Sequence, residues 1–195
     1  MIRPLYFHNP NQEGFEAIIK HLHSKNYKFI SIEELYSRLE KNDTKGKLAY
    51  ISFDDGWQGN LKLIPIIEKY NVHITIFIAV NPIMSGNFWW EFVAKKVGYT
   101  QMQNFKNLPH DEFESQLKKI KTEVADLQRS AMTIDELETI TKHPLISIQS
   151  HTINHPILTK LPDDLLDFEL SESQKQLEKI TGKSIFAFSY PNGSI

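Results

Sequence analysis

The sequence predicts an α/β fold built on a mostly parallel sheet, either a barrel or an open sheet with helices on both faces. Short runs rich in Ile, Phe, Val and Tyr alternate with longer segments whose apolar residues recur at helical spacing. This alternation is typical of repeated βα units, whose strands pair in parallel. The chain has 195 residues and shows no repeat or Gly/Ser-rich linker, so one domain over residues 1–195 is expected.

The expected strands are short and carry β-branched or aromatic residues, as buried strands do. In chain order they are Pro4–His8, Lys28–Ser31, Leu48–Asp54, His73–Val80, Leu145–Ser150 and Ser184–Tyr190. Polar motifs directly follow the third, the fifth and the sixth of these strands. The carboxyl ends of parallel strands are where α/β folds bind their ligands, so these motifs are the candidates for a functional site.

The expected helices show apolar residues three or four positions apart. In chain order these residues are Phe15, Ile18, Ile19 and Leu22, then Leu61, Ile64 and Ile67, then Phe113, Leu117, Ile120, Val124 and Leu127 of a charged helix over Asp111–Arg129. Thr133 and Glu136 form a capping-box pattern that begins a fourth helix. A fifth helix runs from Pro162 to Ile180, and Gly182 is placed to end it.

The segment from residue 81 to 130 is the least regular part of the sequence, and we expect an insertion at the end of a strand. It opens with the aromatic run Phe88, Trp89 and Trp90 and continues with charged residues. Loops at strand ends often hold the substrate in α/β enzymes, and aromatic faces stack on sugar rings. Trp89 and Trp90 are therefore candidate substrate contacts. Packing within the insertion is the alternative.

Composition and charge exclude several classes of protein. The net charge of −2 offers no basic field for a nucleic-acid backbone, so no nucleic-acid partner is expected. The absence of cysteine excludes disulfides and thiolate metal ligands. No run approaches the roughly 18 apolar residues of a membrane span, and the first residues lack the apolar core of a signal peptide. A cytoplasmic protein is expected, with a secreted or envelope-associated one as the alternative.

Two adjacent carboxylates, Asp54 and Asp55, follow the third expected strand in the motif FDDG at residues 53–56. Neighbouring strand residues point to opposite faces, so both acids reach one site only if the chain turns, and Gly56 permits such a turn. Adjacent carboxylates repel each other, and a bound cation would remove that repulsion. The alternative is a helix N-cap, where aspartate is favoured.

A pair of histidines, His151 and His155, lies in the motif HTINHP at residues 151–156, directly after the fifth expected strand. Histidines four apart reach one ion when the segment between them is a helical turn, and neutral imidazole suits zinc and similar metals. With Asp55 they offer two nitrogen ligands and one oxygen ligand, the composition of a catalytic metal site with open positions. Two surface histidines in a loop are the alternative.

The last expected strand leads into the turn sequence SYPNG at residues 189–193. Pro-Asn-Gly is a turn signal, and a plain loop after a strand is one interpretation of it. A tight turn also directs backbone N–H groups outward, where they can hold an oxyanion.

The order of these motifs, FDDG, then HTINHP, then FSYPNG, resembles that of the polysaccharide deacetylase family, also called carbohydrate esterase family four or the NodB-homology domain. The resemblance extends from about Leu5 to the last residue. It implies a distorted TIM-like barrel of the (β/α)7 type. It also implies a metal-dependent hydrolase that removes acetyl groups from a polysaccharide or glycan precursor, with N-acetyl groups as the first expectation and O-acetyl groups as the alternative.

The resemblance also implies roles for single residues. Asp54 matches the general base of the family, and Asp55, His151 and His155 match its metal ligands. Zinc is the expected ion, and cobalt or nickel would be accepted by the same ligands.

In the third motif, the backbone N–H of Asn192 matches the position of an oxyanion donor in the family. Tyr190 and Pro191 match residues that shape the substrate groove. The expected partner is therefore an acetylated carbohydrate.

The sequence departs from the family pattern in two places. An arginine that orients the base in the family has no equivalent in Ser184–Ser189, and the sequence ends at Ile195 before the Leu-x-x-His motif that supplies a general-acid histidine. We therefore expect a barrel that is incomplete at its C-terminal end. Either the sequence is a fragment of a longer protein, or a homo-oligomer or a partner chain closes the barrel. His8, at the end of the first strand, is a candidate substitute for the acid, with a structural histidine as the alternative.

The expected function is thus hydrolysis of carbon–nitrogen bonds in linear amides other than peptides, on an acetylated sugar. One alternative is a hydrolase of the same fold that acts on an amide outside carbohydrates. The other is an inactive, truncated remnant that binds metal or sugar.

Overall fold

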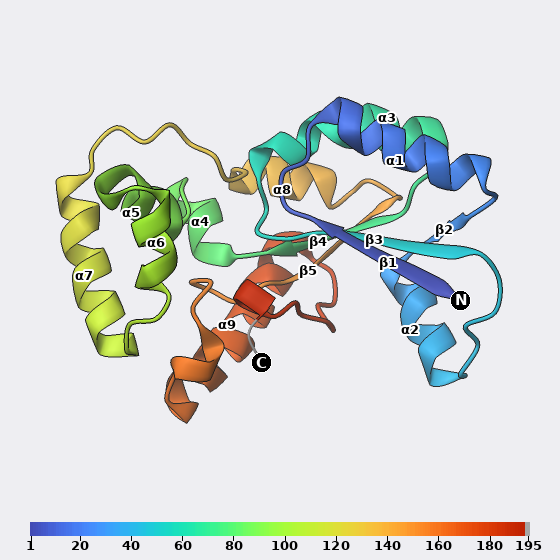
Figure 1. Ribbon diagram of the computed structural model, residues 1–195. Coiled ribbons are helices and arrows are strands. Elements are labelled where there is room, and N and C mark those ends of the chain that lie inside the picture. The colour runs from blue at the N-terminus through green and yellow to red at the C-terminus, as the bar shows by residue number, and fades with distance from the viewer. Residues whose placement is uncertain (194–195) are drawn as a thin grey trace.

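The computed structural model describes residues 1–193 and has the expected α/β fold, while Ser194 and Ile195 lie outside the described residues. Within this range, one parallel sheet contains β1 (Ile2–Phe7), β2 (Lys28–Ile30), β3 (Leu48–Phe53), β4 (Ile74–Ile78) and β5 (Ile146–Ser150) (Figure 1). The strands run in the order β1-β3-β4-β5, and β2 pairs with the first half of β3. Five of the predicted strands are therefore confirmed.

The central strands β3 and β4 are buried along their whole length. Such burial is typical of parallel strands whose faces are covered by other elements. The register pairs Phe53 with Ile76 and Ile78 with Ser150. The carboxyl ends of β3, β4 and β5 therefore open onto one edge of the sheet, where the FDDG and HTINHP motifs begin.

The main core lies between the sheet and the helices α1 (Gln12–Ser24), α3 (Ile64–Tyr70), α8 (Ile134–Ile140) and α9 (Asp163–Thr181). Figure 1 shows α1, α3 and α8 along one side of the sheet, with α9 below β5. A short 3-10 helix (Gln58–Leu63) precedes α3. The capping box of Thr133 and Glu136 begins α8, and Gly182, with φ of +65°, ends α9, as the sequence predicts.

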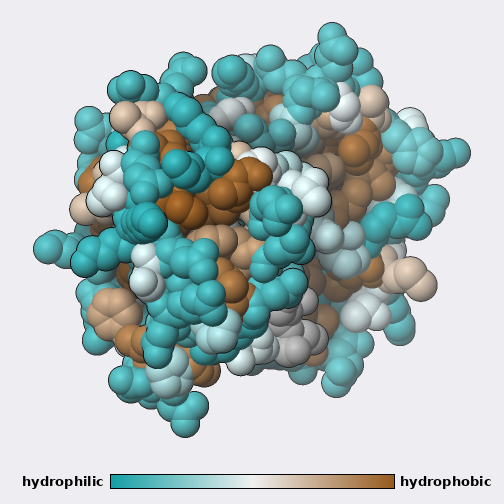
Figure 2. Space-filling view, turned by 60° about the vertical axis from the view of Figure 1, so that its left-hand side comes forward, coloured by the Kyte–Doolittle hydropathy of each residue, from teal (hydrophilic) through white to brown (hydrophobic). Residues whose placement is uncertain are grey.

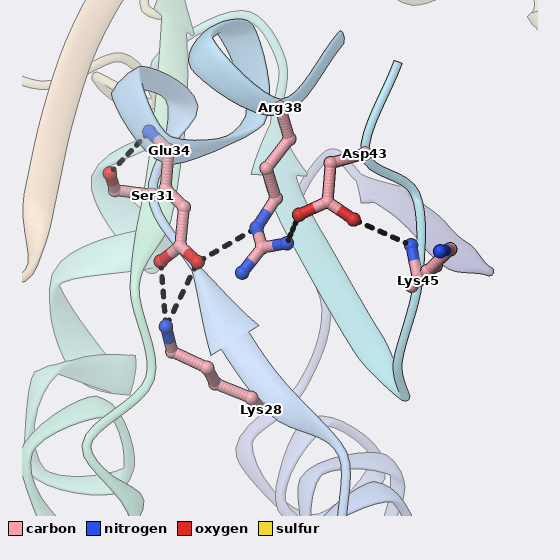
Figure 3. Close-up of polar contacts among 6 residues, drawn as sticks. All are labelled: Lys28, Ser31, Glu34, Arg38, Asp43 and Lys45. Carbon is pink, nitrogen blue, oxygen red and sulfur yellow. Dashed lines mark hydrogen bonds and ion pairs between the residues drawn. The ribbon is translucent and has the colours of Figure 1, made fainter. Parts of the chain in front are cut away.

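Helix α2 (Ile32–Glu40) was missing from the expected helices, and polar contacts at the surface hold its two ends (Figure 3). At its start, Ser31 accepts a hydrogen bond from the backbone N–H of Glu34. The Glu34 carboxylate then accepts from Lys28 of β2 at 2.9 Å and from Arg38 at 2.9 Å. The hydrogen bond from Lys28 lowers the pKa of Glu34. Because these side chains are partly exposed, the network orients α2 more than it stabilises the fold.

The segment after β4 is more regular than its sequence suggests. It forms α4 (Val80–Ser85), α5 (Trp89–Val97), α6 (Tyr99–Phe105) and α7 (His110–Glu123). The last three of these helices share a second apolar core, separate from the main one, that contains Trp89, Val93, Met102, Phe105, Phe113, Leu117 and Ile120. Figure 2 views the molecule from this side, where hydrophilic residues surround smaller apolar areas. The helices form because they bury this cluster together.

The charged helix expected over Asp111–Arg129 is shorter than predicted. Helix α7 ends at Glu123 instead of Arg129, because Val124 is extended and Lys95 donates to the backbone oxygens of Ala125 and Asp126 at 3.0 and 3.3 Å.

No helix among the described residues has the length and apolar character that crossing a membrane requires.

The strand expected at Ser184–Tyr190 is wrong: in the described part of the chain this segment forms no strand and makes a single bridge, between Ser150 and Phe188. Gln149 explains the difference. Its side-chain oxygen accepts from the backbone N–H groups of Phe186 and Ala187, at 3.0 and 2.9 Å, so a side chain takes the place of a strand neighbour. The segment still runs beside β5 and delivers the third motif to the same edge of the sheet.

Candidate metal centre and active site

The FDDG motif forms a tight turn directly after β3. The backbone N–H of Asp54 still donates to Phe7 at 2.9 Å, as in the strand, whereas Asp55 and Gly56 have φ of +77° and +92°. A side chain on Gly56 would start 2.8 Å from Ile78, so glycine is needed there for space as well as for conformation. The turn lets both acids reach one cavity, as predicted. The N-cap alternative is wrong, because the following 3-10 helix is capped at Trp57.

The HTINHP motif brings its histidines together by a route other than the expected helical turn. Thr152 and His155 have φ of +70° and +56°, so the segment is a loop. The backbone N–H of His155 donates to the hydroxyl of Thr152 at 3.1 Å. Two left-handed residues fold the loop back, which places both imidazoles on the side of Asp55.

Asp55, His151 and His155 come together as the sequence predicts. Oδ1 of Asp55 lies 3.4 Å from Nε2 of His151 and 3.3 Å from Nε2 of His155. The three candidate ligand atoms lie within 4.8 Å of one another, and all three residues are buried. No hydrogen bond of good geometry reaches this Oδ1 from the described residues. A buried carboxylate oxygen that faces two imidazole nitrogens fits a divalent cation.

Neighbouring groups fix the orientation of these candidate ligands. Trp57 donates from Nε1 to Oδ2 of Asp55 at 2.8 Å, which leaves Oδ1 for the histidines. Nδ1 of His151 lies 2.9 Å from the backbone oxygen of Ser189. The carbonyl can only accept, so the proton of His151 is assigned to Nδ1 and the lone pair of Nε2 points toward Asp55. Both contacts are typical of the outer shell of a metal site.

The protonation states of two of these residues also suit a metal. Burial alone would raise the pKa of Asp55, but the nearby imidazoles of His151 and His155 outweigh it, so the pKa lies well below its usual range. Burial lowers the pKa of His155. At neutral pH the site therefore presents an ionised carboxylate and a neutral imidazole, the forms that bind divalent cations.

Asp54 lies beside this group without belonging to it. Its Oδ2 accepts from the hydroxyl of Ser189 at 3.4 Å, and its Oδ1 is buried with no partner among the described residues. Burial raises the pKa of Asp54; His151 opposes the rise and Asp55 adds to it. The pattern described in the sequence analysis has an arginine that orients this carboxylate, and here Ser189 contacts it instead. The only sequence feature that indicated Ser189 was its position in the third motif.

A cavity of about 810 Å³ opens above these residues, lined by His8, Asp54, Asp55, Trp90, His151, His155, Tyr190 and Asn192, among others. The Trp90 ring packs edge-on against His155, with ring centroids 4.7 Å apart. Asn192 has φ of +61°, and its side-chain nitrogen is buried without a partner among the described residues. Pro191 is buried within the same turn.

The expectation that Trp89 contacts substrate needs correction. Its side chain is 4% exposed and packs against Phe105 and Phe113 of the second core. Its Nε1 donates to the backbone oxygen of His155 at 3.1 Å. Trp89 thus supports the histidine loop, while Trp90, the next residue, faces the cavity.

Glu169 of α9 is a residue of this site that the sequence did not reveal. One carboxylate oxygen accepts from the backbone N–H groups of Ile153 and Asn154, at 2.8 and 2.9 Å, and the other accepts from the Asn154 side chain at 2.6 Å. One turn later, Ser173 bonds Ser150 at 2.7 Å. Helix α9 therefore fixes the histidine loop. The sequence feature that could have indicated Glu169 is its spacing: it lies four and eight residues before Ser173 and Leu177, on the buried face of α9.

We expect Glu169→Ala to weaken binding of a divalent metal at the candidate centre about 10- to 100-fold and to lower the melting temperature, because it leaves the backbone N–H groups of Ile153 and Asn154 unpaired. Glu169→Gln keeps the shape and an acceptor oxygen, so it should recover part of the zinc affinity. Asp167→Asn, an exposed change on the same helix, is the matched control. Equilibrium dialysis with zinc and thermal unfolding measure both effects. A lower melting temperature with unchanged zinc affinity would show that Glu169 supports the fold without positioning the histidines.

Taken together, the fold and the site define a class: a parallel α/β protein with a candidate Asp-His-His metal centre at the carboxyl edge of its strands. The sequence profile of the polysaccharide deacetylase family matches residues 41–195. The chain belongs to this family.

Single relatives agree with this assignment. YxkH of Bacillus subtilis (strain 168), a provisionally named polysaccharide deacetylase, is 24% identical over 186 residues, which cover 94% of this chain and 50% of YxkH. The chain thus spans about half the length of this curated relative. Two solved structures share the fold. Streptococcus pyogenes deacetylase PplD in complex with acetate has a TM-score of 0.68 at 20% identity, covering all of this chain and 74% of PplD. IcaB from Ammonifex degensii has a TM-score of 0.70 at 16% identity, and the match covers 98% of this chain and 74% of IcaB.

Proposed function

We propose that this chain is the catalytic part of a metal-dependent deacetylase that hydrolyses N-acetyl groups on a carbohydrate. One observation supports this above all: a half-buried carboxylate, Asp54, lines the same cavity as the Asp55, His151 and His155 group but is not part of that group. A ligand set beside a separate base is what metal-assisted hydrolysis requires.

Asp55, His151 and His155 would hold a divalent cation, with zinc as the first candidate and cobalt or nickel as others. When bound, the cation would activate a water molecule and stabilise negative charge on the acetyl oxygen. Asp54 accepts the proton of the attacking water through Oδ1, the oxygen that has no partner among the described residues. Its raised pKa suits a base that later passes this proton on.

The third motif supplies the next requirement. Asn192 lines the cavity, and we assign its backbone N–H to the oxyanion that forms when water attacks the acetyl carbon. The leaving amine needs a proton. His8 lines the same cavity and is our candidate donor, and this assignment stays a prediction.

A sugar is the proposed substrate because aromatic side chains line the cavity beside the acids. Trp90 and Tyr190 line the cavity, aromatic side chains commonly pack on sugar rings, and the family name refers to polysaccharides. PplD, which shares the fold, was determined in complex with acetate, the product that deacetylation would release.

Acetate release tests the proposal. We expect zinc-loaded protein to release acetate from N-acetylhexosamine oligomers, a chelator to abolish this release, and added zinc or cobalt to restore it. Simple acetylated amines and O-acetylated sugars, assayed in parallel, test the substrate class. Release from the simple amines alone would show an amidase outside carbohydrates. No release from any substrate by a folded, zinc-loaded protein would overturn the proposal.

A further inference from the structure

One wall of the cavity comes from α6 and lies outside the motifs. Tyr99, Gln103 and Lys106 line the cavity and follow each other at intervals of four and three residues, so they share one face of the helix. Lys106 directly follows the last residue of α6 and keeps helical backbone angles. These three residues carry an aromatic ring, an amide and an ammonium group, and they line the same cavity as the candidate metal ligands.

This wall is held firmly in place. Met102 and Phe105 anchor α6 in the second apolar core. Nζ of Lys160 donates to the backbone oxygens of Lys106 and Leu108, at 2.7 and 3.0 Å. Lys160 lies in the segment that follows His155, so the same stretch of chain carries a candidate metal ligand and fixes the end of α6. The position of Lys106 relative to the site is therefore built into the fold.

Lys106 forms no direct ion pair with a cavity residue in the described part of the chain. Asp54 and Asp55 contribute two negative charges, which a divalent cation at the predicted centre would balance. Lys106 then contributes one more positive charge, and within residues 1–193 no hydrogen bond or ion pair to its ammonium group is found. Burial lowers the pKa of Lys106 and Asp55 opposes this, so the ammonium is partly removed from water. A charge in this position favours an anion.

We propose that Lys106 binds an anionic group, a carboxylate or a phosphate, on the acetylated carbohydrate, and that Tyr99 and Gln103 contact the sugar unit that bears this group. The inference rests on the proposed deacetylase function and specifies its substrate class. Lys106 would then select substrates that carry the anionic group, because a charged hydrogen bond from a partly desolvated ammonium is stronger than one between neutral groups.

The first test compares three acetylated hexosamines with the same ring: one neutral, one with a carboxylate and one with a phosphate ester. We expect the wild type to show a kcat/KM about tenfold higher for at least one anionic substrate than for the neutral one. Lys106→Gln should abolish this preference and leave the neutral substrate nearly unaffected, and Lys106→Arg should restore much of it. Lys118→Gln, an exposed lysine of α7, is the control for net charge. The anionic substrate that loses more to Lys106→Gln identifies the group.

The second test measures binding without turnover. In a zinc-loaded Asp54→Asn background, fluorescence of Trp57 and Trp90, which line the cavity, reports the affinity for each of the three sugars. Lys106→Gln should weaken binding of the preferred anionic sugar about tenfold. Equal affinities for neutral and anionic sugars, unchanged by Lys106→Gln, would overturn the inference. Absence of acetate release with intact, lysine-dependent anion binding would instead overturn the proposed function alone.

Discussion

Asp54→Asn is expected to reduce acetate release about a thousandfold while zinc affinity stays close to that of the wild type. The amide has nearly the same shape as the carboxylate but cannot accept the proton of the attacking water. Zinc affinity should persist because Asp54 lies outside the Asp55, His151 and His155 group. The substitution also removes the charge repulsion between Asp54 and Asp55, so we expect no loss of folding stability. Steady-state kinetics and equilibrium dialysis on the same preparation measure the two quantities.

The matched control is Asp167→Asn, which makes the same chemical change at an exposed position on α9. It should leave both quantities unchanged. If Asp54→Asn released acetate at the wild-type rate, the base would have to be another group, and the proposed separation of base from ligands would be wrong.

Asp55→Ala is expected to remove zinc binding and turnover together. Loss of a residue that only orients a ligand costs about 10- to 100-fold in metal affinity. Loss of the sole carboxylate among the predicted ligands should therefore cost more than about 100-fold. Zinc should raise the melting temperature of the wild type, because it binds the folded state, and should no longer do so in the variant.

His151→Ala and His155→Ala should behave like Asp55→Ala, whereas His143→Ala is the control. His143 pairs with Glu68 at the surface, away from the cavity lining. A full zinc-induced rise of the melting temperature in Asp55→Ala would mean that the cation binds elsewhere.

The sequence predicted the centre of the site better than its surroundings. Asp55, His151 and His155 were predictable because each follows a strand, and parallel strands end at one edge. Gly56 signalled the turn that brings Asp54 and Asp55 to one cavity. The backbone of the histidine loop was not predictable, because tertiary contacts hold its left-handed residues: the backbone oxygen of Thr152 accepts from the N–H of Val80, and that of His155 accepts from Trp89.

Other features depended on distant partners. Trp89 and Trp90 are neighbours in sequence, and only the packing of α5 against α6 and α7 decides which of them faces the cavity. The strand expected at Ser184–Tyr190 is replaced by hydrogen bonds to Gln149, a side chain whose role no local pattern indicates. Lys106 belongs to none of the motifs, because its place in the cavity wall depends on how α6 packs against α5 and α7.

Anomalous diffraction at the zinc absorption edge, from crystals grown with zinc, tests the central claim most directly. We expect a strong peak about 2.0–2.2 Å from Oδ1 of Asp55 and from Nε2 of both His151 and His155, with Asp54 outside bonding distance. A peak at any other place, or no peak at this centre in crystals that hold zinc elsewhere, would contradict the account.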